Sequence, residues 1–413
     1  MENGSNSQRQ KLLVILGAGS SIPYGMPCVS AINKQMIKWS DEWEHENQVN
    51  PFKSLWNVSQ GYYKQDKFHK GVYPNYESVL GNMLAIAKWL SLETYGDPII
   101  DKLIEVEDIG KLFGFVDGGC LNAGTNNLDQ HQFLIDILAK YFRAKCQEVE
   151  NTPPENFDGY INFFKEIRKA FDVGVYNLNH DNLAYRALKK TNEGVFTGFD
   201  DWNFQPDEIY NRKEWDFLYH LHGSVHFNLI ENLDLTHETD LIIWQDWQDD
   251  GKKSFTDIGF PQMEASFDAN WIPLATILTG GFKREQLAPE PFQTFQSALS
   301  KHVHEADAIL IIGYGFGDSH INRALQNRFY LPSRHKPPPK VYIIDKEAKE
   351  ENFFWNTFTK QVFILSGVVD ENDKDFANYL ERSQRVKFKL DKRGTEEAFA
   401  DTKPILDWLK GKV

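Results

Sequence analysis

The stretch Leu12-Leu13-Val14-Ile15-Leu16-Gly17-Ala18-Gly19-Ser20-Ser21 joins an apolar run to a glycine turn. A short, continuous apolar run is typical of a strand that is buried on both faces, as in a parallel sheet. We expect the turn to open a helix, whose N-terminus and main-chain N–H groups would bind an anion such as a phosphate. The dinucleotide fingerprint needs a third glycine, but position 22 is Ile22. Taken alone, the stretch also fits a strand, turn and helix without a ligand.

Three later motifs repeat this arrangement, because each places polar residues or glycines directly after a short apolar run. The carboxyl ends of parallel strands lie along one edge of a sheet, where ligands bind in α/β proteins. Four such strand ends therefore predict a single site. The motifs and the runs before them are Asn177–Asn182 after Val173–Tyr176, His222–Ser224 after Phe217–Leu221, and Gly313–Asp318 after Ala308–Ile312.

At these residues the chain resembles the sirtuin superfamily. The motif Gly17–Ser21 is followed, at the spacing of that family, by Gly25-Met26-Pro27. The family's Asn-x-Asp after a strand is similar to Asn179-His180-Asp181, and its His-Gly at a strand end is similar to His222-Gly223. The resemblance covers the two ends of the chain and leaves out its middle.

A closer resemblance is to the sirtuin-like NAD hydrolases of bacterial antiphage defence. Leu221-His222-Gly223-Ser224 and Gly313-Tyr314-Gly315-Phe316-Gly317-Asp318 are similar to two patterns of that branch. The resemblance implies an α/β fold with a Rossmann-like parallel sheet of the sirtuin type. It also implies cleavage of NAD to ADP-ribose and nicotinamide, with NAD as the substrate. One branch pairs a chain of about this size with a HerA-like ring ATPase, which is the implied partner.

The resemblance implies roles for three residues. Asn179 would bind a ribose hydroxyl and a water, and Asp181 would orient Asn179 or the nicotinamide amide. The alternative is an Asx-type turn that closes the strand, which these residues also favour, although we favour the functional interpretation. His222 is the candidate general base, because a histidine of near-neutral pKa can take a proton from water or a ribose hydroxyl. A structural histidine is the alternative, and His220, His222 and His226 are a further, metal-binding alternative that we do not favour.

The remaining candidate residues would bind the nucleotide. The glycine turn suits the pyrophosphate, and the loop after Ala308–Ile312 suits the adenosine side. Asp345 ends the apolar run Val341–Ile344 and would accept a hydrogen bond from the ribose 2′-OH, which would favour NAD over NADP. The candidate nucleotide-binding residues are Gly17, Ala18, Gly19, Ser20, Ser21, Gly313, Tyr314, Gly315, Asp318 and Asp345.

Two departures from the sirtuin pattern bear on function. Protein-deacetylating sirtuins carry Asp-Phe-Arg where this chain has Cys28-Val29-Ser30. They also hold a structural zinc on four cysteines, whereas this sequence contains 3 cysteines, so that site cannot form. We therefore expect no zinc. A zinc-free protein deacylase or ADP-ribosyl transferase remains an alternative, and a non-catalytic sensor of NAD or ADP-ribose is a second one.

The composition of the chain restricts the classes of molecule that the protein is expected to bind. The 413 residues carry a formal net charge of −14, which disfavours general binding to nucleic acid or to anionic membranes. Few cysteines, a polar N-terminal segment and no long apolar run predict a cytoplasmic protein that does not enter the membrane.

The apolar runs also predict the organisation of the chain. We expect a discontinuous catalytic domain over residues 8–413, formed by about 8–28 and 160–413, with a helical insertion at 28–160. Within the insertion, apolar residues three and four apart predict helices at Val29–Trp39, Tyr76–Ser91 and Gln132–Cys146. Residues 228–270 are expected to form a long irregular segment. Because an uncontrolled NAD hydrolase would drain its own cell, we expect a homo-oligomer whose contacts involve the insertion and whose activity is gated.

Overall fold

The computed structural model describes residues 9–47, 50–65, 74–91, 120–191, 194–230, 241–248, 252, 254–256, 274–279, 286–330, 336–346 and 388–411. The chain forms two compact units, which are treated separately below. The first unit contains Met1–Met26, Lys145–Ser224 and Pro291–Val413, and the second contains Pro27–Ala144 and Val225–Glu290. The second unit thus joins residues 225–290 to the helical segment, whereas the sequence grouped them with the sheet.

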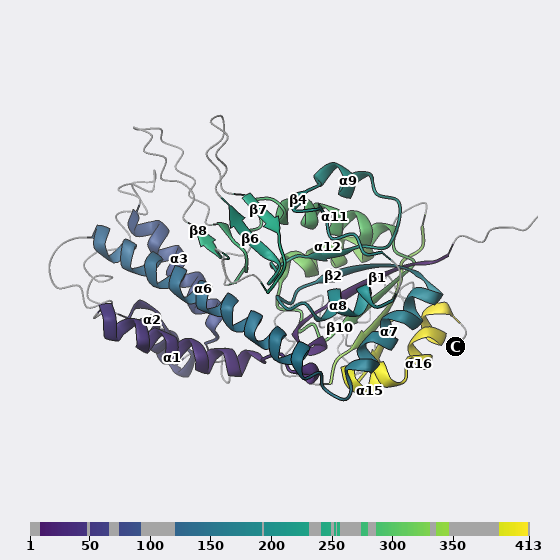
Figure 1. Ribbon diagram of the computed structural model, residues 1–413, viewed down its shortest axis with the longest axis horizontal. Coiled ribbons are helices and arrows are strands. Elements are labelled where there is room, and N and C mark those ends of the chain that lie inside the picture. The colour runs from purple at the N-terminus through teal and green to yellow at the C-terminus, as the bar shows by residue number, and fades with distance from the viewer. Residues whose placement is uncertain are drawn as a thin grey trace, which may run out of the picture. The chain divides into compact units, whose positions relative to one another are not determined.

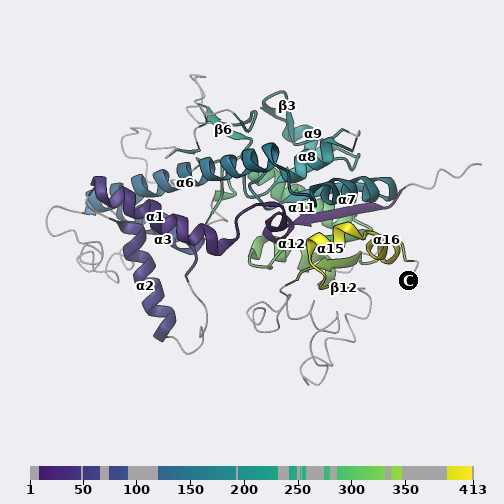
Figure 2. The ribbon, with the colours of Figure 1, turned by 60° about the horizontal axis from the view of Figure 1, so that its bottom comes forward.

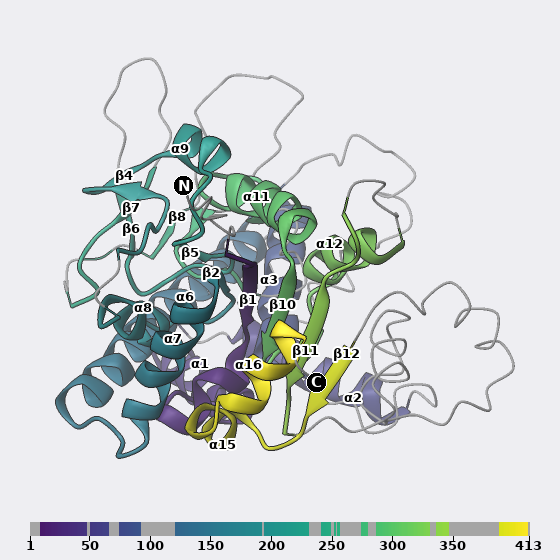
Figure 3. The ribbon, with the colours of Figure 1, turned by 90° about the vertical axis from the view of Figure 1, so that its right-hand side faces the viewer.

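The first unit is built on a six-stranded sheet in the order β12-β11-β10-β1-β2-β5. Every neighbouring pair is parallel, and Figure 3 shows the strands side by side. The predicted α/β class with a Rossmann-like parallel sheet is confirmed. The strands are β1 (Lys11–Leu16), β2 (Asp172–Asn177), β5 (Leu218–His220), β10 (Ala308–Ile312), β11 (Lys340–Ile344) and β12 (Phe388–Asp391).

Burial explains why the central strands read as continuous apolar runs. Val14 lies between Leu310 of β10 and Val175 of β2, and all three side chains are fully buried. Helices cover both faces of the sheet: α7 (Phe157–Ala170) packs on β2 with α15 (Thr395–Ala400) beside it, and α11 (Phe292–Glu305) packs on β1 and β5 (Figure 3). A strand covered on both faces gains from an apolar side chain at every position.

The other elements of this unit connect or flank the sheet. Figure 1 shows α12 beside α11, against which it packs, and α8 packs against α7. The elements are η1 (Ala18–Ser20), η2 (Ile22–Tyr24), α8 (Leu183–Lys189), β3 (Phe199–Asp200), β4 (Asn203–Phe204), α9 (Pro206–Asn211), α12 (Ser319–Tyr330) and α16 (Lys403–Lys410).

Within the described ranges, the second unit contains four helical segments, three of which correspond to the predicted helices, while Pro51–Gln65 was not predicted. These are α1 (Val29–Asn47), α2 (Pro51–Gln65), α3 (Tyr76–Ser91) and the first part of α6 (Cys120–Asn151), and Figure 2 shows them clearly. All three predicted helical segments are confirmed, although α1 and α6 extend well past their predicted ends. Trp39 of α1 packs edge-on against Tyr141 of α6, with ring centroids 5.5 Å apart, and Trp39 belongs to the buried core.

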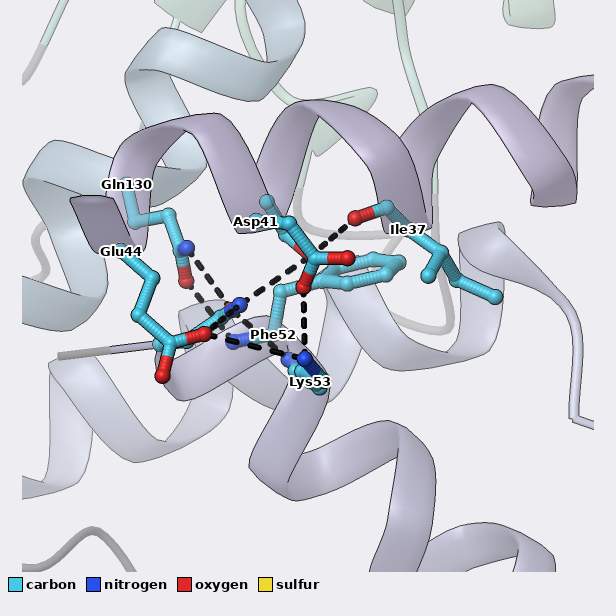
Figure 4. Close-up of polar contacts among 8 residues, drawn as sticks. Ile37, Asp41, Glu44, Phe52, Lys53 and Gln130 are labelled. Carbon is cyan, nitrogen blue, oxygen red and sulfur yellow. Dashed lines mark hydrogen bonds and ion pairs between the residues drawn. The ribbon is translucent and has the colours of Figure 1, made fainter.

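A buried amide ties the start of α2 to α6. Gln130 Oε1 accepts a hydrogen bond of 2.7 Å from the main-chain N–H of Phe52, and Gln130 Nε2 donates to Asn50 Oδ1 at 3.0 Å (Figure 4). At the surface of the same corner, Lys53 Nζ lies 2.7 Å from Asp41 Oδ1. The buried pair satisfies one of the free N–H groups at the helix start, which otherwise would lack a partner.

Residues 228–270 are not simply irregular, so that expectation is wrong for the described part. β6 (Phe227–Ile230) and β7 (Leu241–Trp244) form an antiparallel pair, and β8 (Phe255–Thr256) pairs with β9 (Leu274–Ala275). Strands this short carry too few residues for a clear period-2 pattern. Residues 231–240, 249–251, 253 and 257–270 lie outside the described residues. Over the described ranges, none of the helices has the length and apolar character that a membrane crossing requires.

Candidate functional site

The glycine turn after β1 is fixed against the turn after β10. Gly17 N–H donates to Ile312 O, and Gly19 N–H donates to Gly313 O, both at 2.9 Å. A Cβ on Gly17 would lie 2.5 Å from Gly313 O, and one on Gly19 would lie 2.7 Å from Gly313 Cα. These contacts are too short for any side chain. The two glycines are therefore required first by the approach of one main chain to another.

The turn does not open an α-helix, so the predicted helix N-terminus is wrong. Two 3-10 turns follow instead, η1 and η2, and Gly25 ends the second one in the left-handed conformation at φ 98°. The N–H groups of Ser20 and Ser21 donate to Gly17 O and Ala18 O. The exposed residue of the turn is Ala18, and its N–H takes part in none of the main-chain bonds that hold the described turn. An anion at this turn would therefore meet Ala18 N–H rather than a row of amides.

Asn179, just beyond β2, holds the turn from the other side. Its Nδ2 donates to Gly17 O, Ser20 Oγ and Ser21 Oγ, each at 3.0 Å. The residue is 8% exposed. None of the hydrogen bonds made by the described residues uses its Oδ1, so one end of the amide is engaged and the other remains an acceptor.

Asp181 is buried and closes the turn that precedes α8. Its Oδ1 accepts a hydrogen bond of 3.0 Å from Leu183 N–H, so the Asx-type turn considered as an alternative does form. Burial raises the pKa of the Asp181 carboxyl, while the bonds from Leu183 N–H and the Ser21 hydroxyl oppose that rise. Because Ser21 Oγ also accepts from Asn179, Ser21 links the carboxylate to the Asn179 amide.

His222 follows β5 and lies against the residues that begin α12. Its Nε2 is 3.2 Å from His320 Nε2 and 3.9 Å from Asp318 Oδ1. His222 is buried, and Gly223 turns the chain away from it in the left-handed conformation, at φ 90°. His220, two residues earlier, is also buried, and burial lowers its pKa to about 4. His220 Nδ1 lies 3.4 Å from Asn179 O, so it faces the end of β2.

The loop after β10 is braced by Tyr314. Its hydroxyl donates to Asp318 O, and Asp318 N–H donates back to that hydroxyl, both at 3.1 Å. Asn322 Nδ2 donates to Phe316 O at 2.7 Å, and Phe316 takes a left-handed φ of 55°, which is rare for a residue with a side chain. Burial holds the pKa of the Tyr314 hydroxyl well above its usual range. Tyr314 thus positions Asp318 from within the core.

The other two predicted residues stand apart from this network. An added Cβ on Gly315 would meet nothing within 4 Å, so no close packing requires this glycine. Asp345 is half-buried after β11, and its N–H donates to Asp391 O at 3.0 Å. β10 separates β11 from β1, so Asp345 lies two strands from the glycine turn on the same edge of the sheet.

Sequence reasoning missed His320. The motif considered from the sequence stopped at Asp318, although Ser319-His320-Ile321-Asn322 continues it into α12. His222, Asp318 and His320 form a group whose possible ligand atoms all lie within 4.8 Å of one another. The metal group considered from the sequence included His226, which belongs to the second unit. The group in the structure contains Asp318 and His320 in place of His220 and His226.

A model of the SIR2-like domain matches residues 173–363. Solved structures similar to this chain include a Sir2 homologue in complex with 2′-O-acetyl ADP-ribose, at 12% identity and a TM-score of 0.36, covering 98% of this chain and 93% of that chain. A Sir2 homologue bound to NAD is 10% identical, with a TM-score of 0.36, and the match covers 98% of this chain and 91% of that chain. No curated protein matches the chain. The chain is therefore sirtuin-like over residues 173–363.

Proposed function

We propose that this protein hydrolyses NAD at the nicotinamide–ribose bond and releases ADP-ribose and nicotinamide. The match to the SIR2-like domain over residues 173–363 supports an NAD-dependent activity. The observation that carries the proposal is the Asn179 amide. Its Nδ2 is anchored on the glycine turn by three acceptors at 3.0 Å, and its Oδ1 is left to accept a hydrogen bond.

Cleavage of this bond places positive charge on the ribose while a neutral nicotinamide leaves, so a strong acid is not needed. In our proposal, Asn179 Oδ1 accepts a hydrogen bond from a ribose hydroxyl or from the attacking water. Ser21 and Asp181 keep the amide in that orientation through the contacts described above. An anchored amide needs no reorganisation when the reaction occurs, which is the condition under which such groups assist catalysis best.

His222 is the proposed general base, since an imidazole nitrogen can take a proton near neutral pH. The Nε2 contact with His320 requires one of the two rings to donate and the other to accept at a distance of 3.2 Å. That contact couples the tautomers of the two rings, because the ring that donates must carry its proton on Nε2, and it limits the rotation of His222. We propose that His222 receives the proton of the water that attacks the ribose.

Main-chain and carboxylate groups would hold the nucleotide. Ala18 N–H is the proposed contact for a phosphate oxygen, because the other N–H groups of the turn are used within the protein. Asp345 is the proposed partner of the ribose 2′-OH, since a carboxylate would repel the 2′-phosphate of NADP. Gly313, Tyr314, Gly315 and Asp318 remain the proposed adenosine side of the site.

Structural zinc is not part of the proposal, because a tetrathiolate site needs four cysteines and the sequence has 3. We further propose a cytoplasmic homo-oligomer that acts in antiphage defence with a HerA-like ATPase. Gating would involve the helical segment and Asp234–Trp271, most of which lies outside the described residues. Such segments commonly act as lids or as contacts between subunits.

The test is a nicotinamide-release assay on the purified full chain, with and without a HerA-like ATPase. We expect release from NAD without any acylated peptide, and release at least roughly 100-fold slower in His222→Ala. Release that depends on an acylated peptide would replace the proposal with a deacylase. Binding of NAD or ADP-ribose with no release under either condition would replace it with a sensor.

A further inference from the structure

We propose that His222, Asp318 and His320 bind a divalent transition-metal ion of the Zn²⁺ class, with an open coordination position for water. Two imidazoles and one carboxylate are ligands that suit such ions. All three residues belong to the first compact unit, so their relative placement is fixed by one packed core. Metal binding at this site does not depend on NAD cleavage. Only the expected effect of the metal on activity rests on the proposed function.

The distances fit a shared ion. Two nitrogens on one tetrahedral Zn²⁺, each about 2.0–2.1 Å from the metal, lie roughly 3.3 Å apart. The Nε2 atoms of His222 and His320 are 3.2 Å apart. Asp318 Oδ1 is 3.9 Å from His222 Nε2, and the ligand atoms of all three residues lie within 4.8 Å of one another. A side-chain shift of roughly 0.5–1.5 Å would therefore complete three-ligand geometry.

The support around the ligands favours a preformed site. The Tyr314 hydroxyl holds the main chain of Asp318 through two hydrogen bonds of 3.1 Å. Asn322 Oδ1 also lies 3.1 Å from that hydroxyl and shares its single hydrogen with Asp318 O, and Asn322 N–H donates to Asp318 O. Ligands on such a braced loop lose little conformational freedom when they bind an ion. Groups that orient metal ligands commonly contribute a factor of about 10–100 in affinity.

The charges are also suitable. Two neutral imidazoles and one carboxylate give the group a net charge of about −1, which attracts a dication. Without metal, the short Nε2–Nε2 contact requires one proton between the rings. When a metal binds, that proton moves to Nδ1 of the same ring, so both imidazoles stay neutral and both Nε2 lone pairs face the ion, with no change in oxidation state. Asp318 precedes α12, so its carboxylate also offsets the positive helix N-terminus that would otherwise disfavour a cation.

Metal on His222 would remove its lone pair from catalysis. If the proposed function holds, Zn²⁺ is therefore an inhibitor of NAD cleavage rather than a requirement, and a chelator restores activity. This differs from a structural zinc, whose removal would unfold the protein.

The experiment titrates the metal-free full chain with Zn²⁺ by calorimetry and with Co²⁺ by visible absorption. We expect one ion per chain, and at least roughly 100-fold weaker binding in His320→Ala and Asp318→Asn. His304→Ala is the matched control, because His304 is an exposed histidine on α11 of the same unit. It should bind the ion like the parent chain.

Zinc X-ray absorption of the parent chain supplies a second measurement that does not depend on the variants' folding. A first shell with two imidazoles and oxygen ligands is expected. The proposal is overturned by no binding at millimolar Zn²⁺, by sulfur ligation, or by equal affinity of the folded His320→Ala variant. Zinc binding by a chain that never releases nicotinamide would uphold the metal site and reject only the proposed function. Nicotinamide release that is unaffected by bound Zn²⁺ would overturn the inhibitory role.

Discussion

Replacing Asn179 by Ala tests the two roles of this amide, which anchors the glycine turn through Nδ2 and in our proposal assists the reaction through Oδ1. Its Nδ2 has two hydrogens that serve three acceptors at 3.0 Å, so the substitution removes the equivalent of two full hydrogen bonds. A net loss of about 0.5–1.5 kcal/mol for each bond gives about 1–3 kcal/mol of unfolding free energy. The glycine turn would lose its tie to β2, while the bonds of Gly17 and Gly19 to the β10 turn would remain.

Asn182→Ala is the matched control. Asn182 lies three residues further along, is fully buried, and has no hydrogen-bond partner for either side-chain amide atom within the described part of the chain. Both substitutions remove the same side-chain volume, so the cavity contributions are similar and the difference between them reports the hydrogen bonds. We therefore expect Asn179→Ala to be less stable than Asn182→Ala by about 1–3 kcal/mol.

Urea unfolding, followed by tryptophan fluorescence and circular dichroism, measures this difference. Equal unfolding free energies for the two variants would refute the anchoring role. Turnover and NAD affinity complete the experiment, since the proposed role of Oδ1 is in the reaction. Hydrolysis should be lost in Asn179→Ala while calorimetry still detects NAD binding. If both fall by the same factor, Asn179 contributes affinity alone.

Four further results are expected. His222→Ala should lower NAD turnover at least roughly 100-fold, the usual contribution of a positioned base, with an unchanged circular dichroism spectrum; near-normal turnover would remove His222 from the mechanism. Gly17→Ala should destabilise the fold by about 1–3 kcal/mol, because its Cβ would lie 2.5 Å from main-chain oxygen, whereas Gly315→Ala, with nothing within 4 Å, should have a much smaller effect in the same denaturation assay. Asp345→Ala should reduce the preference for NAD over NADP, and an unchanged ratio of kcat/KM values would assign 2′ recognition elsewhere. Burial lowers the pKa of His302 to about 3, below its unfolded value of about 6.5, so the unfolded chain binds the proton first. The stability that His302 contributes is complete above pH 6.5 and falls as the pH drops toward 3, with about 2 kcal/mol lost at pH 5. In denaturation experiments between pH 7 and 5, a folded His302→Gln variant should therefore lose less unfolding free energy than the parent chain.

The sheet was predictable because its strands are short apolar runs bounded by glycines and polar residues. Val14 and Leu310 are buried on strands covered from both faces, so every position favours an apolar side chain. The helix expected after Gly17–Ser21 was not found, because Gly25 turns left-handed within a few residues. The pair β6–β7 was missed because ten residues, 231–240, separate two four-residue strands, too far for a hairpin turn signal.

The site was less predictable, because contacts between strand ends depend on how the strands are ordered. No pattern in the sequence shows that His320 lies 3.2 Å from a histidine 98 positions earlier. That distance follows from the loop that Tyr314 braces. Extending the predicted motif by two residues would have included His320, since a histidine at the start of a helix after a strand lies at the same sheet edge.

Asn179 shows why structural and functional interpretations of one residue need not compete. From the sequence, a turn-closing asparagine and a catalytic asparagine were alternatives. In the structure, Nδ2 has a structural role other than the Asx-type turn, because it anchors the glycine turn through three acceptors. This fixes the direction of Oδ1, which the catalytic role requires. A side-chain amide has a donor end and an acceptor end, so anchoring one end positions the other. The same reasoning applies to Asp181, whose Oδ1 closes the turn at Leu183 while Ser21 connects the carboxylate to Asn179. Replacing Asn179 or Asp181 should therefore lower both the free energy of unfolding and the rate of NAD cleavage. The relative size of these two losses shows how much each residue contributes to the fold and to the reaction.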